Sequence, residues 1–488
     1  MILRNVSLSV LAVMFAACAE QPVSVEQQFV EDVTAALGGR NAIEAVETLT
    51  MEAEGRMLNI GQDLTPEAAT MEFDITDYKL TADLANNRSR TELTRTPLFD
   101  YFRGRDPMPQ VNGIDGNVAY DIGADGSARR AHEDVATDRR SSYYHHPLPL
   151  LRAALLNMAT VGNIRDEGGN TLADVTLDSG KVFTLAIDSA SKLPTYIGST
   201  DHHYYLRDIV RQTEFSEYIA VGDVMLPSVI SQSFDEFHVF RIQVTAQSVN
   251  DPVTGASAPQ DVIAATPVTG SSPAQVTAEQ LADGVWVLAG QSHHSVLFEF
   301  SDHLKLLEAP NEVRTLAVIA KAKELVPGKP LTHMINTHHH FDHSGGIRTA
   351  VSAGLTVITQ AANEAFYRRM AEQPSTLVPD TLSRAPRGIE IEVVDEKATY
   401  ADDAMTVELY HVAGSQHSNS IMMAYLPEQR VLIEADLYNP GRTTPQLFAP
   451  NLLDNIQNYG LEVERIVPIH GGTIDFEELE SAVHVLRN

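Results

Sequence analysis

One stretch constrains this chain more than any other: THHHFDHSGG, residues 337–346, which directly follows the apolar segment LTHMIN. Its spacing is H-x-H-x-D-H, over His338, His340, Asp342 and His343. Alternate residues of an extended backbone point the same way, so the first two imidazoles can meet at one point and the next pair, a turn further on, at a neighbouring point. Imidazole and carboxylate ligands suit zinc, and also iron or manganese. The stretch therefore predicts a site for two metal ions in a loop between a buried strand and a helix.

Three further residues of ligand type occur downstream. His417 lies in AGSQHSNS, Asp436 ends the apolar segment VLIEAD, and His470 ends the apolar segment IVPIH. Strand ends are where an α/β fold places its site. A histidine-rich loop can also be a solvated surface run, but that alternative does not account for seven ligand-type residues at such places.

The pattern of apolar residues divides the chain into two parts. Residues 24–39 predict a helix capped by Ser24, a second short helix follows at 42–46, and a third begins at Leu148. Most of the remaining sequence up to about residue 250 consists of short runs that alternate apolar and polar residues, with Gly, Asp and Asn between them. The sequence therefore predicts a β-rich α+β domain over 19–250, mostly an antiparallel sheet with a helix laid on it.

A linker and a second domain follow. Residues 251–276 are rich in proline and small polar residues and lack a sustained apolar period, which predicts a linker. In residues 277–488, apolar strands alternate with longer helical patterns, and this order is typical of an α/β domain.

The charge of the chain limits its partners. The 35 Lys and Arg residues stand against 65 Asp and Glu residues, which gives a net charge of −30. This charge would repel phosphate backbones and does not favour anionic membrane surfaces. We therefore expect a small-molecule substrate and no nucleic acid; the sequence predicts no oligomeric state.

The first eighteen residues have the pattern of a secretory signal. A short apolar run ends in small residues, and the run is too short to span a membrane. Phe15-Ala16-Ala17-Cys18 resembles a bacterial lipobox, and Cys18 is the only cysteine of the chain. The sequence therefore predicts export to the periplasm, with a lipid on Cys18 anchoring the protein to the outer membrane, or cleavage after Ala19 as the alternative.

The histidine and aspartate motifs resemble those of the metallo-β-lactamase superfamily. The resemblance covers residues 277–488 and implies an αβ/βα sandwich with a metal site at one edge. His338, His340, Asp342 and His343 match the signature of the family residue by residue, and His417, Asp436 and His470 match its downstream ligands. By this resemblance, one metal ion is held by His338, His340 and His417, the other by Asp342, His343 and His470, and Asp436 bridges the two.

The resemblance implies a hydrolase with two zinc ions, in which a metal-bridging hydroxide attacks an ester, lactone, thioester or amide. Asp342 would orient the hydroxide and pass its proton on. Tyr438 resembles a tyrosine near the bridging aspartate of lactonases, so we also predict it as catalytic. Many β-lactam-hydrolysing relatives carry Cys or Ser where this chain has Asp436.

Two alternatives remain open from the sequence. One is β-lactamase-like activity. The other is a non-catalytic envelope lipoprotein that binds apolar ligands through the first domain, which weakly resembles the curved sheets of lipoprotein carriers. Several histidines stay outside the predicted site: His293, His294, His339 and His411 in the second part, and His145, His146, His202 and His203 in the first.

Overall fold

The computed structural model describes residues 23–68, 70–100, 104–272, 274–290, 293–308, 310–442 and 446–488. The predicted signal segment 1–18, with Cys18, lies outside the described residues. Within the described ranges, no helix combines the length and the apolar character needed to cross a membrane.

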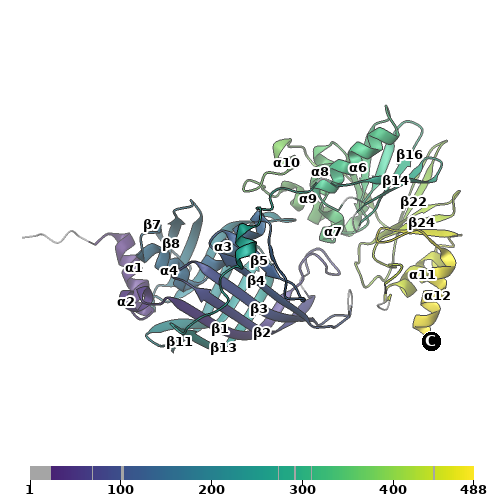
Figure 1. The fold of residues 1–488 in the computed structure, drawn as a ribbon. Coiled ribbons are helices and arrows are strands. Elements are labelled where there is room, and N and C mark those ends of the chain that lie inside the picture. The colour runs from purple at the N-terminus through teal and green to yellow at the C-terminus, as the bar shows by residue number, and fades with distance from the viewer. Residues whose placement is uncertain are drawn as a thin grey trace, which may run out of the picture.

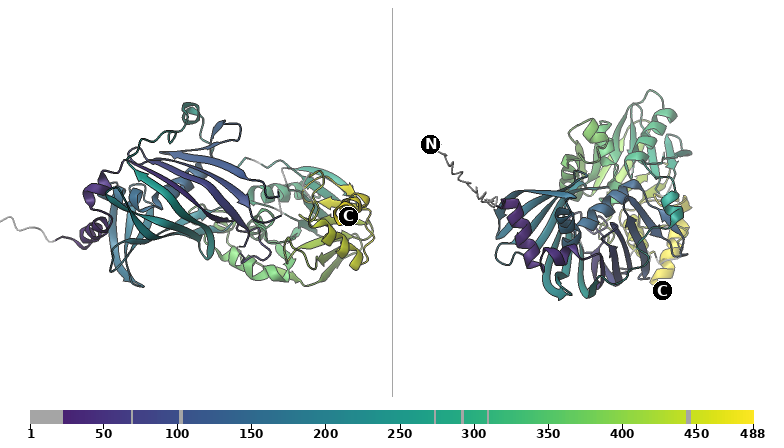
Figure 2. Two further views of the ribbon diagram at one scale, coloured as in Figure 1. Left: turned by 90° about the horizontal axis from the view of Figure 1, so that it is seen from below. Right: turned by 60° about the vertical axis from the view of Figure 1, so that its left-hand side comes forward.

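The first half is built on one sheet of thirteen strands, each paired antiparallel with its neighbours. The spatial order runs from β6 back to β1 and then from β13 back to β7, so the first and last strands pair at the centre. The strands are β1 (Thr48–Leu58), β2 (Glu72–Asp83), β3 (Arg88–Pro97), β4 (Met108–Asp115), β5 (Val118–Ile122), β6 (Ala128–Arg130), β7 (Ala159–Glu167), β8 (Asn170–Leu177), β9 (Val182–Asp188), β10 (Pro194–His203), β11 (Arg207–Val221), β12 (Val224–Phe234) and β13 (Phe237–Val249). Figures 1 and 2 show that the sheet is strongly curved.

Four helices accompany this sheet: α1 (Val25–Ala36), α2 (Arg40–Glu44), α3 (Glu133–Tyr144) and α4 (Pro147–Leu155). Ser24 and Gln27 form a reciprocal cap at the start of α1, as expected for a Ser-x-x-Gln sequence. Phe29 and Val33 of α1 and Leu151 of α4 belong to the apolar core of the sheet. Helix α3 was not predicted, because its sequence is mostly polar and buries few side chains.

Part of the segment predicted as a linker, residues 251–276, lies against the first sheet. The segment contains one short helix, α5 (Gln260–Ala264). Ala258 and Val262 are buried against Tyr120 of β5, whose hydroxyl donates to the carbonyl of Ala256. The segment is therefore attached to the first half along this stretch.

The second half contains two sheets. The first has the order β14-β15-β16-β17-β18-β19-β20 and the second β21-β22-β23-β24-β25-β26. Their strands are β14 (Thr277–Ala282), β15 (Val285–Ala289), β16 (Ser295–Glu299), β17 (Leu304–Leu307), β18 (Leu331–Ile335), β19 (Thr356–Gln360), β20 (Ile391–Val394), β21 (Lys397–Ala401), β22 (Thr406–His411), β23 (Met422–Leu426), β24 (Val431–Glu434), β25 (Arg465–Pro468) and β26 (Ile474–Asp475). The neighbouring strands β17–β18, β18–β19, β19–β20 and β24–β25 pair in parallel.

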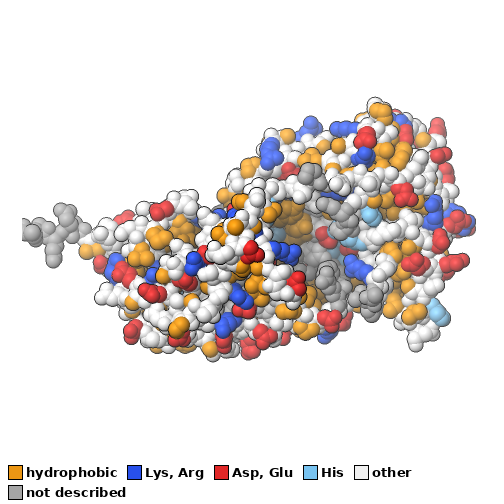
Figure 3. Space-filling model, in the orientation of Figure 1, with side chains coloured by type: hydrophobic (Ala, Val, Ile, Leu, Met, Phe, Trp, Pro, Cys, Tyr) orange, Lys and Arg blue, Asp and Glu red, His pale blue; other side chains and the backbone are white. Residues whose placement is uncertain are grey.

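Apolar side chains from both sheets form a shared core, which includes Phe298, Ile335, Leu409 and Ile433. Helices cover the outer faces: α6 packs on the first sheet, and α11 and α12 pack on the second. The helices of this half are α6 (Glu312–Leu325), α7 (Phe341–Ser344), α8 (Ile347–Ser352), α9 (Glu364–Glu372), α10 (Thr381–Arg384), α11 (Ala449–Asn458) and α12 (Phe476–Arg487). Figure 3 shows a hollow between the two halves of the molecule, in which hydrophobic and histidine side chains gather.

Candidate metal centre

The seven predicted ligands come from loops at one edge of the two sheets. His338 and His340 follow β18, and Asp342 and His343 lie in the short helix α7. The other three lie between β22 and β23, directly after β24, and directly after β25. Their strands therefore end at a common edge.

The first group of side chains is His338, His340, His417 and Asp436, whose ligand atoms all lie within 4.8 Å of one another. The Nε2 atoms of His338 and His417 are 3.1 Å apart, and Asp436 Oδ2 lies 3.1 Å from His417 Nε2. All three histidines are fully buried. This donor set, three imidazoles and one carboxylate around a point, fits a zinc ion.

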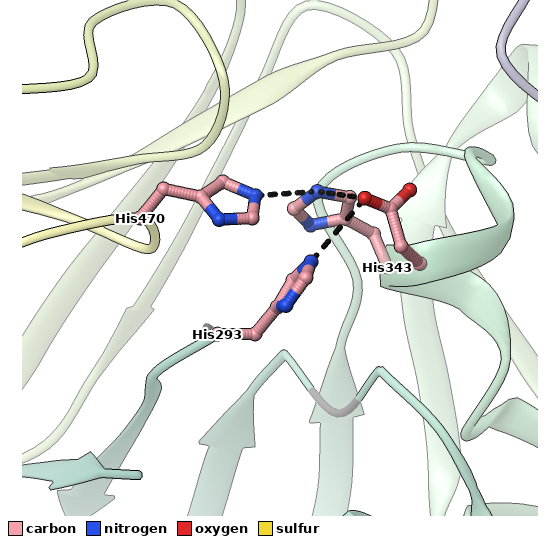
Figure 4. A group of neighbouring side chains, drawn as sticks. His293, His343 and His470 are labelled. Atoms are coloured by element: carbon pink, nitrogen blue, oxygen red, sulfur yellow. Dashed lines mark hydrogen bonds and ion pairs between the residues drawn. The ribbon is translucent and has the colours of Figure 1, made fainter. Parts of the chain in front are cut away.

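The second group is His293, Asp342, His343 and His470, again with ligand atoms within 4.8 Å of one another. Figure 4 shows the imidazoles of His293, His343 and His470 pointing toward one another. Asp436 touches this group as well, because its Oδ1 lies 2.8 Å from His470 Nε2 and its Oδ2 lies 3.0 Å from His343 Nε2. The Asp436 carboxylate thus lies between the two groups.

His293 is the residue that the sequence left unassigned. It lies between β15 and β16, and its Nε2 is 3.3 Å from Asp342 Oδ2. Its ring centroid lies 4.1 Å from that of His470. The only signal in the sequence was a pair of adjacent histidines just before the strand SVLFE, which does not distinguish a ligand from a surface residue.

Buried side chains behind the ligands fix the orientation of their rings. Glu308, directly after β17, is fully buried; its Oε2 lies 3.0 Å from His343 Nδ1 and its Oε1 accepts from the Thr337 backbone N–H at 2.7 Å. Thr337 Oγ1 in turn lies 2.9 Å from His338 Nδ1. These contacts leave the Nε2 atoms of His338 and His343 directed at Asp436, an arrangement typical of metal-binding histidines.

The first half of the chain also reaches this centre, through the connection between β1 and β2, residues 59–71. The Asp63 carbonyl lies 2.9 Å from His340 Nε2. Gln62 Nε2 donates to Asp342 Oδ1 at 2.7 Å, and the Gly61 carbonyl accepts from the Phe341 backbone N–H at 3.1 Å. Three successive residues of one half therefore contact three residues of the ligand loop of the other. No motif in the sequence indicated this contact.

Electrostatics favours an ionised Asp436 carboxylate and neutral imidazoles at His338 and His340. Burial lowers the pKa of His338 and of His340 well below the ordinary value, which keeps both in the form that binds a metal ion. Burial alone would raise the pKa of Asp436, but the adjacent His343 and further imidazoles hold it well below its usual range. Burial alone would lower the pKa of His343, but the nearby carboxylates, Asp436 foremost, raise it well above its ordinary value.

The backbone at Asp436 has φ +62, the left-handed region, and a buried acid supports this turn. Glu434 Oε2 accepts from the backbone N–H groups of Leu437 at 2.9 Å and Tyr438 at 3.3 Å. Burial raises the pKa of Glu434 to about 8. The turn aims the Asp436 carboxylate back toward the four histidines that surround it.

The contacts of Tyr438 do not support the catalytic role predicted for it. Its hydroxyl donates to Glu478 of α12 at 3.0 Å, and its ring packs in the apolar cluster of α11 and α12. His339 points away from the metal centre, as expected, toward Ser420 and the Asp63 carbonyl. His411 is the last residue of β22, and its Nε2 lies 2.8 Å from the Asn419 carbonyl oxygen.

The family profile of the metallo-beta-lactamase superfamily matches residues 306–470, from β17 to the last of the predicted ligands. The C-terminal half is a metallo-beta-lactamase superfamily domain. No curated protein matches the chain. The resemblance stated from the sequence is therefore confirmed for this half.

Several solved structures are similar to the C-terminal half. A metallo-beta-lactamase from Pontibacter korlensis is 18% identical over 44% of this chain and 100% of its own, with a TM-score of 0.34. The metallo-beta-lactamase FIM-1 from Pseudomonas aeruginosa, in its mono-zinc form, is 20% identical over 44% of this chain and 96% of its own, with a TM-score of 0.35. A rubredoxin oxygen:oxidoreductase from Desulfovibrio gigas is 16% identical over 43% of this chain and 60% of its own, with a TM-score of 0.34.

Proposed function

We propose that the C-terminal domain is a hydrolase that uses two zinc ions to cleave an ester, lactone, thioester or amide. The single observation that carries the proposal is that eight side chains form two adjacent groups with Asp436 between them. The order of layers, helices on two sheets that share a core, supports an αβ/βα sandwich as the scaffold.

The residues fit the two ions as follows. His338, His340 and His417 would hold one ion, Asp342, His343, His470 and the added His293 the other, and Asp436 would contact both. When bound, such ions act as Lewis acids and make a water molecule acidic enough to serve as a nucleophile at neutral pH. The chain therefore needs neither a serine nor a cysteine as a covalent nucleophile.

Asp342 is suited to hold and move a proton at this site. Its Oδ1 accepts from Gln62 and its Oδ2 faces His293, so the carboxylate is held from both sides. Burial alone would raise its pKa, but His343 and the hydrogen bond with His293 lower it, so the group is ionised at neutral pH. Its side chain is 35% exposed, more than those of the neighbouring histidines, which leaves an approach for substrate.

The test is a metal analysis and a substrate screen on the purified protein. We expect about two zinc ions per chain and turnover of lactones, thioesters or simple esters rather than phosphodiesters, with β-lactams included in the screen. Asp342→Ala should lower turnover by about 10²-fold or more and reduce the zinc content. Asp302→Ala is the matched control, because Asp302 is exposed and contacts only its neighbour His303 among the described residues.

Two results would contradict the proposal. One is a protein that binds no transition metal after incubation with zinc. The other is turnover of phosphodiesters alone, which would move the reaction to a different class of substrate.

A further inference from the structure

The first half of the chain contains a cavity of about 530 Å³ on the inner side of its curved sheet. Its walls come from β1, β2, β3, β4, β12 and β13, and helices α3 and α4 close one side. We call this space the half-barrel cavity. Its volume lies within the range of about 300–1,000 Å³ that holds small-molecule ligands and far exceeds the gaps of an ordinary packed core.

The walls of the half-barrel cavity are mainly apolar. Leu49, Leu80, Ile230 and Ile242 are typical of the side chains that line it. Two charged residues also line it, but both are engaged with protein groups. Arg139 donates to two backbone carbonyls and to Asp121, and Asp138 pairs with Arg211. The cavity is therefore suited to an uncharged apolar chain.

His146 offers a buried hydrogen-bonding atom to a ligand in this cavity. His146 is 7% exposed and lines the cavity. Its Nδ1 accepts from the Leu148 backbone N–H at the start of α4, so its Nε2 carries the proton. Among the residues that the structure describes, no hydrogen-bond partner lies at this buried Nε2. A buried donor without a partner is costly, and an oxygen atom of a ligand would satisfy it.

The other end of the half-barrel cavity adjoins the metal centre. Ile60 lines the cavity, and the next three residues are those that contact the ligand loop. His203 lines the cavity too, and its ring centroid lies 5.9 Å from that of Phe341. Phe341 directly precedes the ligand Asp342. Ile60 and His203 therefore connect the lining of the cavity with the ligand loop, Ile60 along the chain and His203 through its contact with Phe341.

We propose that the half-barrel cavity holds the unbranched apolar chain of a substrate whose acyl bond is hydrolysed at the metal centre. His146 donates a hydrogen bond to an oxygen atom on that chain. This inference rests on the proposed function and names its substrate class: esters, thioesters or lactones with a long acyl chain that carries an oxygen atom away from the carbonyl group. It gives the first half of the protein a binding function.

The first test measures binding without catalysis. Titration calorimetry with 1-alkanols of increasing length, on the wild-type protein and on Asp342→Ala, should show affinity rising about fourfold per added methylene until the cavity is filled. The variant His146→Asn keeps a side-chain acceptor for the Leu148 N–H. Its amide N–H does not reach as far into the cavity as the imidazole Nε2–H does. We expect it to weaken binding about twofold to tenfold at every chain length.

A pair of variants on one strand locates the binding. Leu80 lines the half-barrel cavity, whereas the exposed Lys79 points to the opposite face of β2. Leu80→Trp should fill the cavity and abolish the dependence on chain length, and Lys79→Trp should retain it. The wild-type titration stands by itself if Leu80→Trp does not fold.

The second test uses p-nitrophenyl esters from acetate to decanoate. The ratio of kcat/KM for decanoate to that for acetate should be large in the wild-type protein and in Lys79→Trp, and should fall toward one in Leu80→Trp. Hydrolysis without dependence on chain length, together with no alkanol binding, would overturn the acyl-chain site and leave the hydrolase standing. Alkanol binding without hydrolysis of any ester would overturn the hydrolase and leave the cavity as a ligand site.

Discussion

Replacing Gly61 by alanine should loosen the metal centre without touching a ligand. Gly61 has φ +75, and an added Cβ would lie 2.2 Å from Cδ2 and 2.4 Å from Cε2 of the Phe341 ring. An alanine in the left-handed region costs about 1–2 kcal/mol by itself. The overlap adds to this cost, because the Phe341 ring is stacked against Tyr205 and is not free to move away. The 59–71 connection must therefore shift.

The shift should weaken zinc binding, because the contacts of this connection with Asp342 and His340 depend on its position. Loss of such outer hydrogen-bond partners typically costs about 10–100-fold in metal affinity, which is about 1.4–2.7 kcal/mol. We would measure the zinc dissociation constants by chelator competition at neutral pH, together with the thermal midpoint. Gly116→Ala is the matched control, since Gly116 has φ +56 and nothing within 4 Å of the added Cβ.

The comparison separates backbone strain from the contact with the metal centre. Both variants should lose stability, but only Gly61→Ala should lose zinc affinity. Equal zinc affinity in the two variants would refute the conclusion that the first half of the chain supports the ligand loop.

Three further predictions follow from the same structure. Glu308→Gln removes the carboxylate behind His343 and should weaken zinc binding about tenfold or more, measured by chelator competition; unchanged affinity would contradict its role. His293→Ala should reduce the zinc content toward one ion per chain, whereas the adjacent His294→Ala should retain two; equal contents would show that His293 is not a ligand. Burial lowers the pKa of His146 to about 4, so below pH 6.5 the unfolded chain takes up a proton that the native chain does not, and the free energy of unfolding should fall by about 2 kcal/mol from this group between pH 7 and 5. Urea unfolding of wild type and His146→Asn measures that difference, and identical pH dependence in the two proteins would contradict it.

The sequence predicted the ligand loop, Asp436 and His470 because each follows an apolar strand closely, whereas His417, in the loop between β22 and β23, was predicted from the family resemblance. In such a case the local pattern determines both the element and the place of its last residue. The helices that begin near Ser24 and Leu148 were predicted for a similar reason, since one has a clear cap and the other a strong apolar face. The α/β character of the second half followed from the alternation of strands and helices.

The features that the sequence missed depend on contacts between distant segments. His293 can be recognised as a ligand only from its position beside three other ligands, which lie about 50 or more positions away in the chain. Asp63 contacts His340 through its backbone carbonyl. Every residue type has this group, so the contact cannot be predicted from the type of side chain. Helix α3 lacks an apolar face, and segment 251–276 packs through small residues that are equally common in linkers.

The topology of the first sheet has a consequence for the order of events during synthesis. Its central pair of strands, β1 and β13, brings Leu49 beside Val249. One edge of β1 therefore stays unpaired until β13, the last strand of the sheet, has been made. Pairing over such a separation is slow, because a long loop must close before any contact forms. The connection that leaves β1 then meets a ligand loop made still later, so we expect zinc uptake to mark the end of folding, once the whole chain has emerged.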